Sequence, residues 1–288
     1  MIDQKNILIT GSNGQLGKTL KDISLRYPYR FFFRSKKELD ITNFFVIKSF
    51  LKKYKINLII NCAAYTNVDN SENDKIISDN VNNLAVNNIS KLCEELEIQL
   101  IHISTDYVFD GLKQIPYNEL DNTNPNNHYG QTKLSGEKKI LSFNLKKSII
   151  IRTSWLYSIY DNNFVSKILF KLKNNKEIYV VKNEIGSPTN SYDLSKTIME
   201  IIPHLTNTKT EIFHFSNLGF CSRFEFAKKI NEFSAFDCIV KERIKNHEKV
   251  IRPKFSALDS SKIIEKFNLK IKTWENSLRT HITYNNFS

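Results

Sequence analysis

Residues 104–107, "STDY", bring two hydroxyls, a carboxyl and a phenol to the end of the apolar run "IQLIHI". Further along, Tyr129 and Lys133 stand four residues apart in "HYGQTKLSGEK", a spacing that puts both side chains on one face of a helix. A lysine cation about 4 Å from a tyrosine, at an effective dielectric of ~20, favours the phenolate by ~4 kcal/mol and lowers the tyrosine pKa. The pair therefore predicts a tyrosine that exchanges a proton near neutral pH.

A second group of residues, "GSNGQLG" at 11–17, follows directly on the first apolar run of the chain. Glycines at this spacing between a strand and a helix permit a tight turn, let the backbone approach a pyrophosphate and let the helix pack closely. The helix N-terminus also attracts the anion. The motif predicts a dinucleotide cofactor, held by Gly11, Asn13, Gly14, Gln15, Leu16 and Gly17.

The kind of dinucleotide depends on the residues after the second apolar run, where the chain reads "RSKKELDI". An acidic residue at the end of this run would bind the ribose hydroxyls of NAD. Cations and a hydroxyl instead suit a 2′-phosphate, which favours NADPH, with NADH as the alternative if these side chains face solvent. The predicted contacts here are Arg34 and Ser35, with Lys36 and Lys37 beside them, and Asp40 and Ile41 on the adenine side.

Short apolar runs alternate with longer amphipathic stretches and position these motifs. We expect strands at residues 5–10, 29–34, 57–62, 98–105 and 147–153. Helical patterns occur at 44–54 and 80–96, and later at 163–173, 193–202 and 223–233. Such alternation predicts an α/β fold, a doubly wound parallel sheet of the Rossmann type with helices on both faces.

The change of pattern after about residue 155 predicts two domains. We expect an NAD(P)-binding Rossmann domain at 1–155. Residues 156–288 should form mainly a smaller substrate-binding domain, with some segments interleaved back into the Rossmann domain.

Composition excludes several classes of protein. The 288 residues carry a net charge of +12, but the lysines are scattered and lack an interleaved aromatic pattern, which argues against a nucleic-acid partner. No apolar run approaches membrane-spanning length and no signal peptide precedes the first strand, so we expect a cytoplasmic protein without a membrane partner. The cysteines have no metal-binding spacing and predict reduced thiols and no metal site: Cys62, Cys93, Cys221 and Cys238.

Several motifs occur together in a fixed order: "NCAAYTNVD", "STDYVFDG", "YGQTKLSGEK", "RTSWLY", "GSPT" and "RPKFSALDSSK". With the glycine motif, they resemble the extended short-chain dehydrogenase/reductases over nearly the whole chain, and most closely the dTDP-4-dehydrorhamnose reductase family. The resemblance implies that a nicotinamide cofactor delivers hydride to C4 of a nucleotide-linked 4-keto-6-deoxy sugar, for surface polysaccharide biosynthesis of the rhamnose or O-antigen type.

The resemblance also implies roles for particular residues. Thr105, Tyr129 and Lys133 would be catalytic, with Tyr129 as proton donor and Asn82 organising the lysine. The segment after the third strand would approach the cofactor through Ala63, Ala64 and Tyr65, with Tyr129 and Lys133 also in contact with it. The sugar would be bound by Thr66, Val68, Thr105, Tyr107 and Trp155.

Departures from the family's pattern bear on the reaction and on the substrate. Related 4,6-dehydratases carry an Asp-Glu pair where this chain has Asp106 and Tyr107, which favours simple keto reduction here. Glu184 and Arg223 depart from the pattern where the nucleotide should bind. We expect Arg223 and Arg252 to contact the diphosphate of a dTDP-, UDP- or CDP-linked sugar.

Two other functions stay open on the sequence. Proteins similar to this family serve as non-catalytic, NADP-binding regulatory subunits of methionine adenosyltransferase, and a nucleotide-sugar epimerase would share the fold. The retained Thr105, Tyr129 and Lys133 favour the reductase. The sequence leaves open the stereochemistry at C4, and whether the protein is a monomer or a homodimer.

Overall fold

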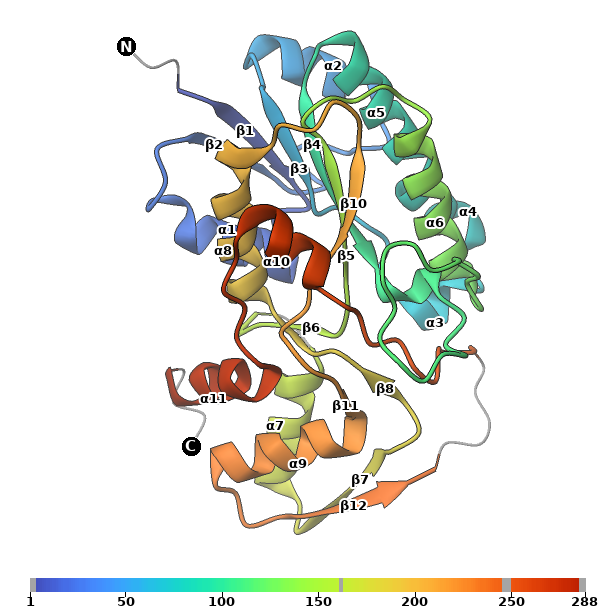
Figure 1. Cartoon of the computed structure of the whole chain (residues 1–288), viewed down its shortest axis with the longest axis vertical. Helices are drawn as coiled ribbons and strands as arrows, with labels where there is room; N and C mark the ends of the chain where they lie inside the picture. Colours follow the sequence, from blue (N-terminus) through green and yellow to red (C-terminus); the bar gives the residue numbers. More distant parts are fainter. Residues whose placement is uncertain (1–3, 161–162, 245–249, 285–288) are drawn as a thin grey trace.

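The computed structural model describes residues 4–160, 163–244 and 250–284. Its centre is a six-stranded sheet in which every pair of neighbouring strands is parallel (Figure 1). The strands are β1 (Asn6–Thr10), β2 (Arg30–Arg34), β3 (Leu58–Asn61), β4 (Gln99–Thr105), β5 (Ile149–Thr153) and β10 (Glu211–His214). Their order is β2-β1-β3-β4-β5-β10, which confirms the predicted doubly wound α/β fold.

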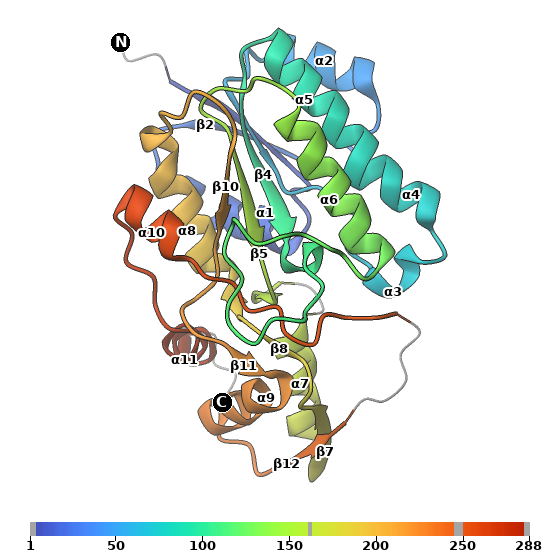
Figure 2. The same ribbon diagram turned by 45° about the vertical axis from the view of Figure 1, so that its right-hand side comes forward.

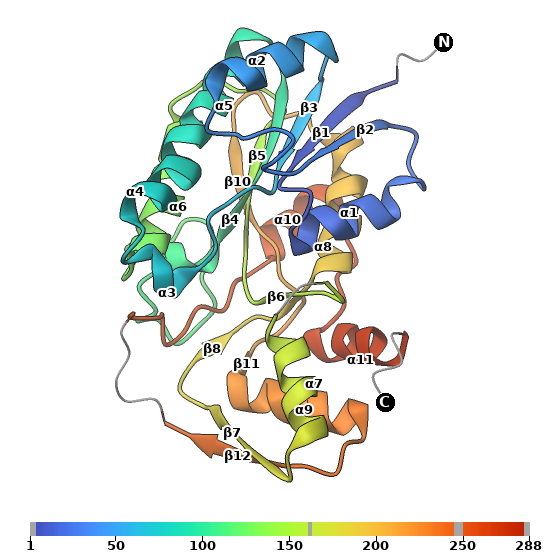
Figure 3. The ribbon, with the colours of Figure 1, turned by 180° about the vertical axis from the view of Figure 1, so that it is seen from behind.

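Helices cover both faces of this sheet (Figures 2 and 3). One face carries α1 (Gln15–Ser24), α8 (Ser191–Ile201) and α10 (Ser261–Phe267). The other carries α2 (Phe44–Lys53), α5 (Ala85–Glu95) and α6 (His128–Leu141). Alternate residues of a strand serve the two faces, so Leu8 and Ile9 of β1 belong to different hydrophobic clusters. Because both faces are buried, the strands read as unbroken apolar runs in the sequence.

A separate hydrophobic cluster lies below the sheet in Figure 1. It is formed by α7 (Phe164–Asn174), α9 (Arg223–Ser234), α11 (Trp274–Tyr284) and the parallel pair of β7 (Glu177–Val181) and β12 (Ile239–Arg243). The second half of the chain also supplies α8, β10 and α10 to the sheet layers. The domain boundary at residue 155 stays a prediction.

Short elements connect these layers. β6 (Leu156–Tyr157) pairs with β9 (Thr189–Asn190), and β8 (Ile185–Gly186) pairs with β11 (Cys221–Ser222). Between β3 and α5 lie α3 (Val68–Ser71), α4 (Lys75–Asp79) and a π-helical turn, Asn80–Leu84. Single 3₁₀ turns follow β4 at Asp106–Val108 and α8 at Ile202–His204.

The turn from β1 into α1 accepts only glycine at two of its positions. Gly11 has φ +63°, and a Cβ on it would lie 2.7 Å from the backbone of Ala63. A Cβ on Gly17 would lie 2.6 Å from the carbonyl oxygen of Gly11. The turn is therefore packed directly against the end of β3, at the point where the strand order reverses.

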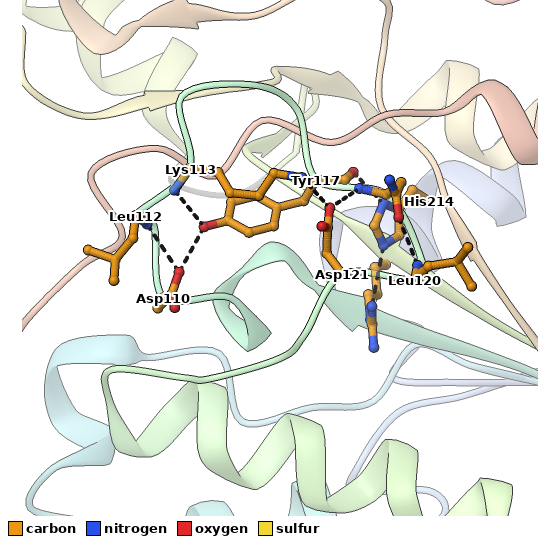
Figure 4. A network of polar contacts seen from close by, with 9 residues as sticks. Asp110, Leu112, Lys113, Tyr117, Leu120, Asp121 and His214 are labelled. Atoms are coloured by element: carbon orange, nitrogen blue, oxygen red, sulfur yellow. Dashed lines mark hydrogen bonds and ion pairs between the residues drawn. The ribbon is translucent and has the colours of Figure 1, made fainter.

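The loop between β4 and α6 is held by a polar network (Figure 4). The hydroxyl of Tyr117 donates to Asp110 at 2.8 Å, and Lys113 Nζ bonds Asp121 at 2.6 Å. His214 of β10 donates from Nδ1 to the carbonyl of Tyr117 at 3.0 Å. The Tyr117 ring also stacks on Phe109, with ring centroids 4.2 Å apart. This anchoring fixes the turn that follows β4.

Within the described part of the chain, no helix combines the length and the apolar composition that a membrane span requires. Nor do three or more His, Cys, Asp or Glu side chains gather there where they could hold a metal ion.

Candidate active site

A cavity of about 830 Å³ opens at the carboxyl ends of β1, β3, β4 and β5. On the side of the glycine turn, the predicted residues that line it are Gly11, Gly14, Gln15, Leu16, Gly17, Asp40, Ile41, Ala63, Ala64 and Tyr65. Towards α6 and α9, the predicted residues that line it are Thr66, Val68, Thr105, Tyr107, Tyr129, Lys133, Trp155 and Arg223. Ligand sites in doubly wound sheets occur at this edge of the sheet.

Three residues predicted to bind the cofactor do not line the cavity. Asn13 is exposed on the turn. The Arg34 guanidinium lies over the Phe50 ring, 5.0 Å from its centroid, and donates to the Phe33 carbonyl at 2.7 Å. The hydroxyl of Ser35 donates to Glu38 at 2.6 Å. The cation that the cavity receives from this loop is Lys36 instead.

Asn82 and Arg252 also lie outside the lining, and each is engaged elsewhere. Asn82 accepts from the Tyr65 backbone N–H at 2.9 Å, and donates to the Tyr65 carbonyl and to Thr132 at 3.0 and 3.1 Å. It thereby ties the segment after β3 to α6, without a direct bond to Lys133. Arg252 pairs with Asp69 of α3 at 2.6 Å.

The electrostatic effect predicted for the tyrosine–lysine pair is wrong in this structure. Burial raises the pKa of Tyr129 to about 12, and a hydrogen bond with Thr105 lowers it only in part. Lys133 does not offset this, because its Nζ donates to the carbonyl of Ile103 at 2.7 Å and lies 3.3 Å from Nε2 of His102. At neutral pH Tyr129 therefore keeps its proton.

Lys133 itself is 2% exposed, which is rare for a lysine. Burial lowers its pKa to about 8, although the charge of Glu137 and the thiol of Cys62 act in the opposite direction. The amine is therefore close to losing its proton near physiological pH.

One turn further along α6, Glu137 forms a buried ion pair that the sequence reading missed. Its carboxylate accepts from Arg152 of β5 at 2.7 and 2.9 Å, and from the hydroxyl of Ser104 at 2.5 Å. The residues Tyr129, Lys133 and Glu137 recur every four positions and form one stripe on α6. That spacing was the signal that could have identified Glu137.

Asp106 lines the cavity with only 2% of its surface exposed. Burial raises the pKa of its carboxyl to about 6, while hydrogen bonds with Ser256 and Thr105 and the charge of Arg223 lower it in part. A carboxyl in such a position is held near its neutral form at mildly acidic pH.

The far end of the cavity is built around Trp155. The Arg223 guanidinium lies over the indole, with its central carbon 3.5 Å from the ring centroid, and its Nε lies 3.6 Å from Glu184. A Cβ on Gly186 would lie 2.5 Å from the indole. Trp155 also has φ +45°, a conformation that costs a non-glycine residue roughly 1–3 kcal/mol and often marks a functional site.

A glycine turn at the reversal point of a parallel sheet, with a hydroxyl, a tyrosine and a lysine beside it, defines a Rossmann-fold dehydrogenase or reductase. Within that class, the chain belongs to the family described as RmlD substrate binding domain, whose model matches residues 5–286. The resemblance to dTDP-4-dehydrorhamnose reductases is thereby confirmed.

Similar proteins cover nearly the whole chain. The dTDP-4-dehydrorhamnose reductase of Sinorhizobium fredii is 34% identical, with 95% of each chain aligned. The spore coat polysaccharide biosynthesis protein SpsK of Bacillus subtilis is 32% identical over 96% of each chain. The crystal structure of a Bacillus anthracis dTDP-4-dehydrorhamnose reductase in complex with NADP is 35% identical, with a TM-score of 0.92 over 98% of this chain and 99% of that one.

The raised pKa of Asp106 makes a prediction about stability. The folded chain keeps this proton up to about pH 6, whereas an unfolded aspartate, with a pKa near 3.8, has already lost it. The free energy of unfolding should therefore fall as pH rises from about 4 to about 6, by up to ~3 kcal/mol from this carboxyl. Asp106→Asn should remove that contribution, because an amide does not ionise.

Urea unfolding of the wild type and Asp106→Asn across this pH range measures the effect. The stability of the variant relative to the wild type should increase with pH and then level off above about pH 7. A difference that is the same at every pH would contradict the raised pKa.

Proposed function

We propose that this chain is an NADPH-dependent reductase of a nucleotide-linked 4-keto-6-deoxy sugar, with dTDP-4-dehydrorhamnose as the first candidate. The observation that carries the proposal is the arrangement of Thr105, Tyr129 and Lys133 in one cavity with the glycine turn. Family membership and the names of the relatives support the same reaction. The product would serve surface polysaccharide synthesis, in keeping with the name of the spore-coat relative.

The cofactor side of the cavity fits a dinucleotide. Gly11 and Gly17 let the turn pack tightly against backbone atoms, and both line the cavity at the N-terminus of α1, where a pyrophosphate would be attracted. We assign the 2′-phosphate to Lys36, the cation of this loop that lines the cavity. When bound, NADPH supplies the hydride.

The proton comes from Tyr129 in this proposal. Because burial raises its pKa to about 12, the phenol is protonated at neutral pH, as a proton donor must be. Thr105, which is hydrogen-bonded to Tyr129, would hold the 4-oxygen of the sugar between the two hydroxyls. After Tyr129 has given up its proton, Lys133 would supply the replacement, because a pKa of about 8 lets its amine exchange protons near neutral pH.

Tyr107 supports reduction rather than dehydration. Its ring packs edge-on against Tyr129 at 5.6 Å between centroids, and burial raises the pKa of its hydroxyl. The position therefore offers no carboxylate that could act as the additional acid or base needed to remove water.

The diphosphate of the substrate would lie near Arg223. This guanidinium lines the cavity, but its Nε faces Glu184, which partly neutralises it. A carboxylate at position 184 would repel a diphosphate, and the contact with Arg223 reduces that repulsion, so dTDP, UDP and CDP all remain candidates. Arg252 would contact the diphosphate only if it left its partner Asp69.

The cytoplasmic location and the monomeric or homodimeric state stay predictions.

Tyr129→Phe tests the reaction. Turnover with dTDP-4-dehydrorhamnose should fall at least ~100-fold, because the proton donor is lost, while the Kd for NADPH should change less than ~3-fold. NADPH oxidation and fluorescence titration measure the two quantities. Near-normal turnover of Tyr129→Phe would contradict the assignment. A wild type that oxidises no NADPH with any nucleotide 4-keto sugar would favour a non-catalytic subunit.

Three alanine variants test the cofactor assignment. Lys36→Ala should lower the preference for NADPH over NADH by ~10-fold in kcat/KM, because one charge-assisted contact is worth ~1.5 kcal/mol. Lys37→Ala is the matched control, since this exposed neighbour does not line the cavity. A larger loss in Arg34→Ala than in Lys36→Ala would return the 2′-phosphate contact to Arg34.

The diphosphate assignment makes a separate prediction. Arg223→Ala should raise KM by ~10-fold or more and lower kcat less, because it removes binding rather than chemistry. Glu184→Gln, the matched change, should lower KM by releasing the guanidinium from its partner. Kinetics with matched dTDP- and UDP-linked substrates measure both. Unchanged KM values in both variants would show that this pair does not face the substrate.

A further inference from the structure

A row of polar side chains crosses the buried sheet just below the cavity. Thr10 of β1, Asn61 of β3 and His102 of β4 occupy matching positions, because Thr10 pairs with Asn61 and Asn61 pairs with His102 in the parallel register. They are 2%, 1% and 0% exposed. The row lies on the face of the sheet that α6 covers, two residues beyond the apolar row that contains Leu8.

Hydrogen bonds join the row from end to end. The hydroxyl of Thr10 lies 2.6 Å from Asn61 Oδ1, and Asn61 Nδ2 lies 3.0 Å from His102 Nδ1. The other ring nitrogen, Nε2, lies 3.3 Å from Nζ of Lys133. One end of this network is therefore an amine that lines the cavity.

Stability alone does not explain these residues. The preceding row on the same strands and the same face is Leu8, Ile59 and Leu100, which needs no hydrogen bonds. A buried polar group that loses its partner destabilises the fold, so an apolar row would serve the sheet with less risk. The polar row is better explained by the contact of its last member, His102, with the amine of Lys133.

The row can match Lys133 in either protonation state. With Asn61 Nδ2 donating to Nδ1, a neutral His102 ring carries its proton on Nε2 and donates to a neutral Lys133 amine. With the amide turned over, Nδ1 donates to Asn61 Oδ1, and Nε2 accepts from the Lys133 ammonium. The hydroxyl of Thr10 can accept or donate, so it completes both arrangements.

We propose that His102 is a positioning residue that holds Nζ of Lys133 at one place in both of its protonation states, with Asn61 and Thr10 supporting the required tautomer. Burial and the charge of Lys133 lower the pKa of His102, which keeps the ring neutral throughout. The other groups that face the amine are the Ile103 carbonyl, Cys62 and Glu137. The proposal rests on the proposed function, in which Lys133 returns the proton that Tyr129 loses.

Two variants separate this role from plain packing. The amide of His102→Gln reaches towards Lys133 and can donate or accept, whereas the shorter His102→Asn reaches Asn61 only. We expect His102→Gln to keep turnover within ~5-fold of the wild type and His102→Asn to lose at least ~30-fold, with a shifted pH profile of kcat. Thermal unfolding and NADPH titration check that both variants are folded and bind cofactor. Equal losses in both, or none in either, would overturn the proposal.

Nitrogen NMR of the imidazole tests the same role without substrate. As pH rises from about 6 to about 10, the His102 proton should move from Nδ1 to Nε2 when Lys133 loses its own. In Lys133→Met the tautomer should stay fixed. A wild-type ring that keeps one tautomer, or that takes up a second proton, would overturn the proposal. Absence of sugar reduction together with the tautomer change would instead reject the proposed function alone.

Discussion

Burial on both faces of the parallel sheet is the constraint on which the rest of the structure depends. Polar side chains within the strands need partners inside the protein, and they reach a ligand only where the strands end. The same burial decides the protonation states of the site. It raises the pKa of Tyr129 and lowers that of Lys133, so both groups are pushed towards their neutral forms. Attraction between the two is not the dominant effect.

The contacts of α6 with β4 and β5 show how these buried polar groups are satisfied. Three residues of α6 meet three parts of the neighbouring strands: Tyr129 meets Thr105, Lys133 meets His102 and Glu137 meets Arg152. Each contact satisfies a polar group that would otherwise be buried alone. The helix is consequently held in register against β4 and β5 by contacts that include the proposed proton donor, Tyr129.

Local patterns explain how much of this was predictable from the sequence. The five expected strands and the glycine turn were found because period and composition are local signals. The insertion of β10 and α8 into the sheet layers was expected only in outline, since it depends on contacts between distant segments. The π-helical turn at Asn80–Leu84 was read as ordinary helix, because one extra residue per turn leaves no mark in so short a pattern.

Side-chain directions were the part that the sequence could not supply. Arg34 was assigned to the cofactor by charge, yet Phe50 and the Phe33 carbonyl offer it partners in the structure. Lys133 was expected to face Tyr129 because both share a helical face. Its Nζ instead contacts the carbonyl of Ile103 and the ring of His102. Spacing places a residue on a face, and only packing decides which neighbour it meets.

The position of β10 has a consequence for how the protein is made. β10 covers the edge of β5 and lies at residues 211–214, and α8 adds Leu194 and Ile198 to the core on one face. Until the ribosome has released these segments, β5 is an open edge strand beside an uncovered apolar surface. The sheet of the first half is therefore completed only when residues 211–214 join it, so its stability depends on a strand that is made much later.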